Sequence, residues 1–178
     1  FGQSTGKLEI GEYAFYGLML TALELPQNAA VSIGAYAFAE NTKVAVFSIG
    51  GAVTVGDYAF ASLGSGTSDG VALVIPASLT DIGNHAFEDA NIQTVSFTGT
   101  STLQTIGAYA FSGADFQTFT VPASVKSIAT YAFANNYSLT ELLFEDGTVD
   151  LAIGVAYEEE YGNILNYSSG VKSLALPG

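Results

Sequence analysis

The chain contains no cysteine and few positive charges. The lack of cysteine excludes disulfide bonds, thiolate metal sites and cysteine nucleophiles. Only 4 Lys and Arg residues stand against 17 Asp and Glu, which gives a formal net charge of −13. A surface this acidic repels phosphate groups, so nucleic acid and anionic membrane surfaces are poor partners.

Long hydrophobic runs are also missing, although 49% of the residues are hydrophobic. No run approaches the ~20 apolar residues of a membrane-spanning helix, so we expect no membrane insertion. The one histidine, His85, has to serve any Ser-His-Asp relay. Asp81 and Ser96 are near it in the sequence, but no nucleophile elbow or oxyanion hole is indicated. We therefore predict no catalytic residues, no enzyme activity and no cofactor.

Acidic residues gather at Glu145-Asp146 and at Glu158–Glu160. A calcium ion needs about six to eight oxygen ligands, and neither run has the spacing of an EF-hand or of a calcium-binding β-helix. We interpret both runs as solvated loops and predict no metal site.

A phrase of the form Ile-Gly-x-Tyr-Ala-Phe dominates the sequence. Its copies end at Phe15, Phe38, Phe60, Phe87, Phe111 and Phe133, and an eroded seventh copy starts at Ile153. Self-similarity at such a period is typical of a solenoid, in which each coil stacks on its neighbours. One Phe per coil then predicts an aromatic row at the ~4.8 Å spacing of strands. Ala129 replaces the phrase's Gly in the sixth copy, which favours close backbone approach over positive φ as the role of that Gly.

Between the phrases, apolar residues alternate with small or polar ones, which predicts a strand with one buried face. The inward pairs are Leu23/Leu25, Val44/Val46, Leu73/Ile75, Val95/Phe97, Phe119/Val121, Leu142/Phe144 and Leu174/Leu176. A further short extended segment then leads into each phrase.

We therefore predict a repeat solenoid, mainly β: a right-handed superhelix of about seven coils of 22–27 residues with short helical turns at the phrases. It forms a single domain over residues 1–178, with repeats at about 8–25, 31–46, 53–75, 79–97, 103–121, 125–144 and 149–176. The longest interval predicts a protruding loop around Leu63 to Asp69. We also expect the chain to be a piece of a longer protein.

These residues resemble the BspA-like class of bacterial and protist leucine-rich repeats. The resemblance is read in Ile128–Phe133, Leu139, Leu142 and Phe144, and in the segment Val121-Pro122-Ala123-Ser124-Val125. The family's frequent Cys is absent, and its place is taken by Leu18, Asn41, Leu63, Ala90, Ala114 and Asn136. The resemblance implies a leucine-rich-repeat superhelix in an extracellular or cell-surface protein that acts in adhesion by protein binding, with no catalytic residues.

Two surfaces are candidates for binding. The outward face of the strands is flat and largely uncharged, and its central residues are Val74, Thr94, Ser96, Thr118 and Thr120. The alternative is an aromatic row along one edge, made of Tyr13, Tyr36, Tyr58, His85, Tyr109 and Tyr131. The leading hypothesis is a module that binds a host or partner-cell surface protein through the strand face. A glycan-binding module and a passive spacer in a larger surface protein are the alternatives.

Overall fold

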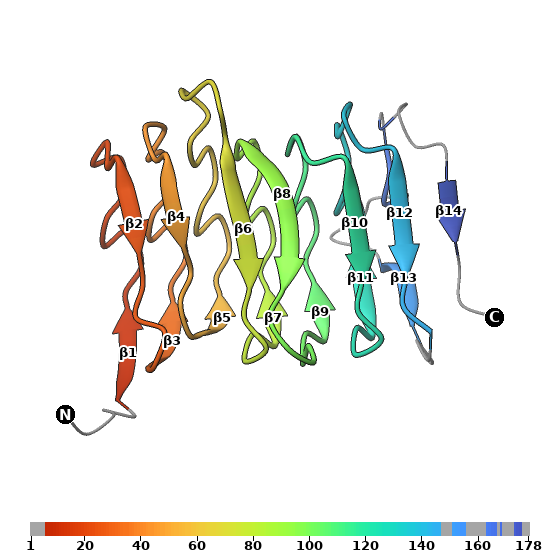
Figure 1. The fold of residues 1–178 in the computed structure, drawn as a ribbon, viewed down its shortest axis with the longest axis horizontal. Coiled ribbons are helices and arrows are strands. Elements are labelled where there is room, and N and C mark those ends of the chain that lie inside the picture. Colours follow the sequence, from red (N-terminus) through yellow and green to blue (C-terminus); the bar gives the residue numbers. More distant parts are fainter. Residues whose placement is uncertain (1–5, 147–150, 156–162, 167, 169–172, 176–178) are drawn as a thin grey trace.

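The computed structural model describes residues 6–146, 151–155, 163–166, 168 and 173–175. The chain winds into a row of stacked coils, in which corresponding segments of successive coils lie side by side (Figure 1). Each coil runs through a strand, a turn that carries the Tyr-Ala-Phe phrase, a second strand and a return to the next coil. The predicted β solenoid is confirmed.

The strand that precedes each phrase belongs to one continuous parallel sheet. Its seven strands follow each other in the order β1 (Lys7–Ile10), β3 (Ala30–Ile33), β5 (Ala52–Val55), β7 (Asp81–Ile82), β9 (Thr105–Ile106), β11 (Ser127–Ala129) and β13 (Ala152–Val155). The aliphatic residue that opens each phrase keeps the register, since Ile10 is opposite Ile33 and Val55 is opposite Ile82.

The strand that follows each phrase belongs to a less continuous layer. Its members are β2 (Ala22–Glu24), β4 (Val46–Ser48), β6 (Val71–Ile75), β8 (Ile92–Phe97), β10 (Thr118–Val121), β12 (Glu141–Phe144) and β14 (Ser173–Ala175). They pair as three separate parallel sheets, β2-β4, β6-β8 and β10-β12-β14. We refer to the outward surface of these strands as the strand face.

The predicted alternation holds in β6, where Leu73 and Ile75 are buried while Val74 is exposed. It fails in β4. Val46 was predicted to point inward, but it lies opposite Ala22 and half of its surface is exposed, and Phe47 lies opposite the buried Leu23.

The prediction of short helical turns is wrong, because the described part of the chain contains no helix. Each phrase forms turns whose backbone bonds to the next coil. Tyr13 N–H donates to Ala35 O at 3.0 Å, and Phe15 N–H donates to Ala37 O at 2.7 Å. The turn also needs the left-handed region at the Tyr position, where φ lies between 55° and 58° in all six copies. These repeated intercoil bonds replace the i to i+4 bonds of a helix.

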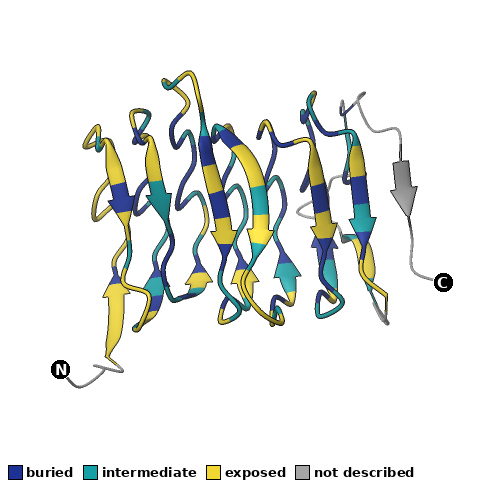
Figure 2. Ribbon diagram, in the orientation of Figure 1, coloured by how far each residue is buried: buried dark blue, intermediate teal, exposed yellow. Residues whose placement is uncertain are grey.

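The core is a central aromatic row, as predicted. Successive Phe rings from Phe15 to Phe133 stack in parallel with centroids 5.0–5.7 Å apart. The rings from Phe38 onward are buried. They belong to one hydrophobic cluster with buried residues that recur along the solenoid (Figure 2). Because the rings between the ends of this row are covered by the coils on both sides, no single coil could bury its own Phe, and Phe15 in the first coil remains 41% exposed.

The Gly after the opening Ile or Val serves close approach in the second to fifth copies, as predicted. In the seventh copy, Gly154 instead has a positive φ of 72°. A Cβ on Gly34 or Gly107 would come within 2.6–2.9 Å of backbone atoms of the preceding coil, and neither residue has positive φ. Ala129 takes the place of this Gly in the sixth copy, where β11 extends to Ala129 and its register against β13 shifts.

Buried polar groups replace the family's Cys in two coils. Asn41 is fully buried, and its amide nitrogen donates to Phe15 O of the preceding coil at 2.7 Å and to Phe38 O at 2.9 Å. Asn136 makes the corresponding bond to Phe111 O at 2.7 Å. Leu63, Ala90 and Ala114 at the same position are buried, while Leu18 in the first coil is exposed. These amides satisfy carbonyl groups that the turns leave in the core.

Two details of the repeat boundaries differ from expectation. The long interval does protrude at the upper edge of the coils before β6 (Figure 1), but Leu63 at its start is buried in the core. In the seventh coil, Ile153 pairs with Ile128 as the eroded phrase predicts. The sixth phrase then bonds to Asn163, Ile164 and Asn166, further along the chain, and the predicted continuation at Ala156 and Tyr157 lies outside the described residues.

Candidate binding surfaces

The strand face brings the five predicted residues onto three neighbouring strands. Val74 of β6 lies directly opposite Ser96 of β8, and Thr94 is opposite Ala72. Thr118 and Thr120 project from β10, and all five residues are exposed. None carries a charge, although the chain as a whole has a net charge of −13. A partner that covers this area would not have to bury a charged side chain and remove its water, which is a large cost of association.

A groove divides this surface between β8 and β10. No strand pairing joins these two neighbouring strands, both of which are fully described. The opening has a volume of about 410 Å³ and is lined by Gln93, Thr94, Val95, Gln117 and Thr118. Gln93 and Gln117 were not among the binding residues predicted from the sequence. They occupy equivalent positions in consecutive coils, immediately before Thr94 and Thr118, and this recurrence could have identified them.

The alternative surface, the Tyr row, is also present. Its rings stack from Tyr13 to Tyr109 with centroids 4.3–4.7 Å apart and planes within 9° of parallel. The last pair, Tyr109 and Tyr131, is tilted by 38°, next to the register shift at Ala129. Because each inner ring is sandwiched by its neighbours, its faces are already occupied, and only edges and polar groups face solvent. A sugar that needs an open aromatic face would not find one in the middle of this row.

A second groove runs beside the Tyr row, with a volume of about 290 Å³. Its lining residues are Tyr16, Tyr36, Ala39, Glu40, Tyr58, Ala61, Ser62, Glu88 and Asp89. Three of them, Glu40, Ser62 and Asp89, hold left-handed backbone conformations with φ of 53–60°. The same turn position carries Gly in the first and fifth coils.

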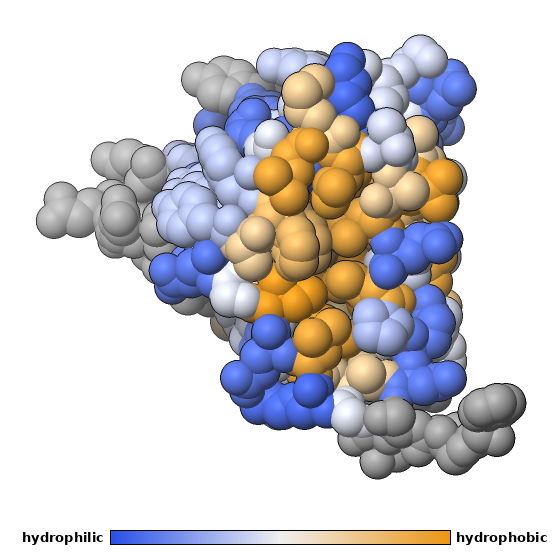
Figure 3. All heavy atoms as spheres, turned by 90° about the vertical axis from the view of Figure 1, so that its left-hand side faces the viewer, coloured by the Kyte–Doolittle hydropathy of each residue, from blue (hydrophilic) through white to orange (hydrophobic). Residues whose placement is uncertain are grey.

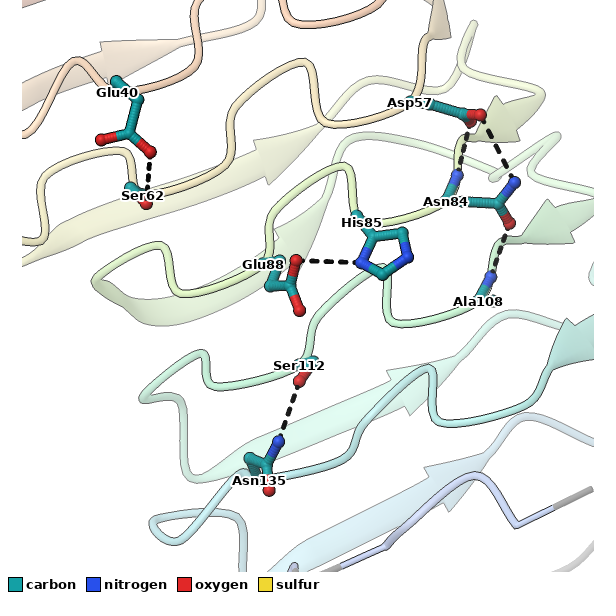
Figure 4. A network of polar contacts seen from close by, with 9 residues as sticks. All are labelled: Glu40, Asp57, Ser62, Asn84, His85, Glu88, Ala108, Ser112 and Asn135. Atoms are coloured by element: carbon teal, nitrogen blue, oxygen red, sulfur yellow. Dashed lines mark hydrogen bonds and ion pairs between the residues drawn. The ribbon is translucent and has the colours of Figure 1, made fainter. Parts of the chain in front are cut away.

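The polar groups along this edge are linked in short chains rather than gathered in one centre (Figure 4). His85 Nδ1 lies 2.9 Å from Glu88 Oε2, and Glu40 accepts a hydrogen bond from Ser62 at 3.2 Å. Burial raises the pKa of the Asp89 carboxyl, and the nearby Glu88 and Glu40 carboxylates raise it further. The edge is therefore acidic, and its negative charges repel one another.

Asp57 and Asn84 form a second polar chain in the same view. Asp57 Oδ1 accepts the backbone N–H of Asn84 at 2.7 Å, and Asn84 Oδ1 accepts that of Ala108 at 2.9 Å. Each side chain thus reaches across to the backbone of the next coil. These two side chains hold neighbouring phrases together.

The residues considered for catalysis and metal binding have other partners. Asp81 accepts hydrogen bonds from Thr80 and Thr105 in the seven-stranded sheet, while Ser96 lies on the strand face. Glu145 accepts the backbone N–H of Ala123 at 3.0 Å, and Glu158–Glu160 lie outside the described residues.

Within the described ranges, no three acidic or histidine side chains are placed to hold a metal ion. The described part of the chain likewise has no apolar helix of membrane-spanning length.

Known proteins were compared with this chain by sequence and by fold. No curated protein sequence is similar to this chain. The fold is similar to that of the pneumococcal vaccine antigen PcpA, with a TM-score of 0.65 and 23% identity over 79% of this chain and 36% of that protein. A leucine-rich-repeat protein from Bacteroides ovatus has a TM-score of 0.45 and 22% identity over 81% of this chain and 33% of its own. This chain therefore spans about a third of the length of each.

A family model also covers most of the sequence. The BspA type leucine-rich-repeat region matches in six copies, over residues 5–69 and 67–155. Most of the residues thus fit this repeat, including all six complete phrases. The chain belongs to the BspA-type leucine-rich-repeat family.

Proposed function

We propose that this chain is a module of a cell-surface or secreted protein and that it binds a protein partner through the strand face. The observation that carries the proposal is the uncharged, exposed area formed by Val74, Thr94, Ser96, Thr118 and Thr120. Solenoids commonly bind through extended surfaces of this kind. Membership of the BspA-type family and the likeness to a pneumococcal vaccine antigen support the surface location.

The groove between β8 and β10 gives this area a feature that a partner can recognise. Gln93 and Gln117 line it with Thr94 and Thr118, so amide and hydroxyl groups are available as both donors and acceptors. A projecting side chain or loop of the partner would enter the groove, while the flat strands on either side would contact its surroundings. Shape and hydrogen bonding, rather than charge, would select the partner.

A glycan ligand is the second candidate function, and the groove beside the Tyr row favours it. Carboxylates of Glu40 and Asp89 lie there near Tyr36 and Tyr58, which supplies polar groups for sugar hydroxyls. The stacked rings argue against this candidate, because they leave no open aromatic face within the row. A passive spacer is the third candidate.

The test is to probe the purified, folded chain against a panel of extracellular matrix and mucosal proteins and, in parallel, against a glycan array. We expect saturable binding to at least one protein that persists at 0.5 M salt (about three times physiological ionic strength), because charge plays little part on the strand face. Binding to glycans alone would favour the Tyr row. No binding on either panel would contradict the proposal and favour the passive spacer.

A further inference from the structure

The groove between β8 and β10 lies beside an irregularity in β8. Val71 and Ala72 are consecutive in β6, but they lie opposite Ile92 and Thr94, so Gln93 is an extra residue in β8. A bulge of this kind bends the strand that carries it, and Figure 1 shows β8 curving toward β6 at its start. Gln93 and Thr94 are both exposed there, and both line the groove. The bulge thus turns the start of β8 away from β10.

Elsewhere the same two coils are joined as closely as the others. Phe87 and Phe111 stack with centroids 5.3 Å apart, and β7 pairs with β9 in the seven-stranded sheet. Phe97 of β8 also packs edge to face on Phe119 of β10, with centroids 6.1 Å apart. The opening is therefore confined to the strand face, and the packed core fixes the two strands that form its walls.

Both walls of the groove present main-chain groups that have no strand partner. In β10, the N–H and carbonyl groups of Thr118 and Thr120 point toward β8, because the residues that alternate with them bond to β12. In β8, the same groups of Val95 and Phe97 point toward β10, because the residues that alternate with them bond to β6. Among the described residues, no backbone hydrogen bond joins the two strands. The groove thus offers two facing rows of donors and acceptors, as free strand edges do.

The side chains of the groove favour one kind of occupant. The lining carries no charge, and Val95 is its one apolar residue. Exposed large apolar side chains lie mostly in the first coil, at the end viewed in Figure 3, and not in the groove. A hydrophobic helix would find little apolar area here, and its own backbone groups are already bonded to each other. An extended polypeptide has free N–H and carbonyl groups along both edges, which is what the two walls can pair with.

We propose that the groove binds an extended, uncharged segment of the protein partner, whose backbone pairs with β10 as an added strand. This inference rests on the proposed function, since it names the part of the partner that the strand face binds. The N–H groups of Thr118 and Thr120 donate to carbonyls of the segment, and the carbonyls of these two residues accept its N–H groups. The amides of Gln93 and Gln117 contact polar side chains of the segment. Backbone pairing provides the affinity, and the uncharged lining disfavours segments that carry Asp, Glu, Lys or Arg.

Two substitutions at Thr120 separate the role of its backbone from that of its side chain. Thr120→Pro removes an N–H that bonds to no other strand of the chain, and proline is tolerated at a free strand edge. Thr120→Ala keeps the N–H and removes the hydroxyl, so it is the matched control. The measurement is the affinity for a panel protein that binds the strand face, after thermal denaturation confirms that both variants fold. We expect Thr120→Pro to weaken binding tenfold or more and Thr120→Ala less than threefold. Equal effects would overturn the proposal.

A peptide probe tests the pairing without a substitution and without a panel protein. A short capped peptide of alternating Thr and Val is added at millimolar concentration to the isotope-labelled chain, and amide exchange is followed by NMR. The control is the same peptide with every backbone nitrogen methylated, which cannot pair as a strand. We expect the unmodified peptide to slow exchange at Thr118 and Thr120 tenfold or more and the methylated peptide to leave it unchanged. The amide of Glu141, already bonded to Gln117 O, should not respond to either.

The outcomes distinguish this inference from the proposed function. A panel protein that binds the strand face, with exchange at Thr118 and Thr120 unchanged by that protein and by the peptide, would overturn the extended segment and leave the proposed function standing. Equal protection by the methylated peptide would also overturn the inference, since backbone pairing would not be the cause. Protection by the unmodified peptide alone, with no binding on the panel, would support the groove as a strand-binding site and contradict the proposed function.

Discussion

The glycines of the second to fifth phrases determine how closely two coils approach. Gly107 lies so near the preceding coil that an added Cβ would come within 2.6 Å of the backbone of Gly83 and Asn84. Main-chain atoms in a hydrogen-bonded stack cannot move aside as the end of a flexible side chain can. The whole coil would have to shift, and the stacked rings with it.

Gly107→Ala should therefore lower the free energy of unfolding by about 1–3 kcal/mol, as overpacking does in other cores. Gly11→Ala is the matched control and should stay within about 0.5 kcal/mol of the parent, because nothing lies near the new Cβ. Urea denaturation measures both. Equal effects of the two substitutions would show that close approach is not what glycine provides.

The acidic edge beside the Tyr row makes a prediction about pH. Burial, Glu88 and Glu40 raise the pKa of Asp89 in the folded protein, so folding disfavours its charged form. Asp89 therefore costs stability when ionised. This cost is absent below the ordinary Asp pKa and grows as the pH rises through the folded value.

Asp89→Asn should accordingly stabilise the protein at pH 7, and the gain should shrink as the pH falls toward 3.8, the ordinary Asp value. Added salt should also reduce the gain at pH 7, since Asp89 is exposed enough to be screened. The measurement is the difference in unfolding free energy between variant and parent across this range. A difference that does not vary with pH would assign the effect to conformation instead of charge.

Much of this residue-level structure could be predicted from the sequence. Recurrence of Phe at one position of every repeat was enough to predict the aromatic row, and Ala129 indicated the role of the glycines. The left-handed φ at each Tyr could not be predicted in this way, because Tyr has no intrinsic preference for that region. The intercoil bonds of the turn impose it, and they appear only when two coils are stacked.

The two strand layers differ in continuity, and β8 and β10 show the consequence. The N–H groups of Glu141 and Glu145 in the sixth coil donate to Gln117 O and Val121 O of the fifth. Thr118 lies opposite Glu141 in the register of β10 with β12. The backbone N–H groups of Thr118 and Thr120 therefore point toward β8, as that of Glu141 points toward β10. There they meet no strand partner, since β10 pairs only with β12.

Hydrogen exchange should therefore be faster at the amides of Thr118 and Thr120 than at that of Glu141. The reason is that the first two amides lack the intercoil bond that protects the third. Amide exchange followed by NMR at neutral pH would measure all three in one sample. Equal protection would mean that β8 and β10 pair in solution and that the groove between them is closed.

Sequence periodicity was least informative about the register and pairing of the strands. Val44, Val46 and Phe47 are all apolar within four positions, so an alternation can be drawn in two registers, and the stack selects the one that places Phe47 inside. β10 keeps its alternation, whereas β8 has an irregularity at Gln93, where Gln93 and Thr94 are both exposed and the register against β6 shifts. The break between β8 and β10 itself does not follow from the pattern of either strand. It is a relation between coils and not a property of one repeat.

At the scale of the whole molecule, the acidic edge beside the Tyr row is distinct from the strand face, the surface proposed to bind. The Tyr edge carries Glu40, Glu88 and Asp89, whereas the central part of the strand face is uncharged. A net charge far from zero favours solubility, and this distribution leaves one face free for contacts that need no charge pairing. The sequence could indicate this face from its Thr and Ser residues, but the groove that gives it shape depended on the stacking.

The central claim is that the strand face is the binding surface. Its most direct test measures the affinity of a protein ligand, once identified on the panel, for three sets of variants whose folding is confirmed by thermal denaturation. Ser96→Arg and Thr118→Arg alter the strand face, Tyr58→Ser and Tyr109→Ser alter the Tyr row, and Asp69→Arg alters the protruding loop. We predict a loss of tenfold or more for each strand-face variant and less than threefold for the others. Full binding by the Ser96 and Thr118 variants, with loss in the Tyr or Asp69 variants, would contradict the claim.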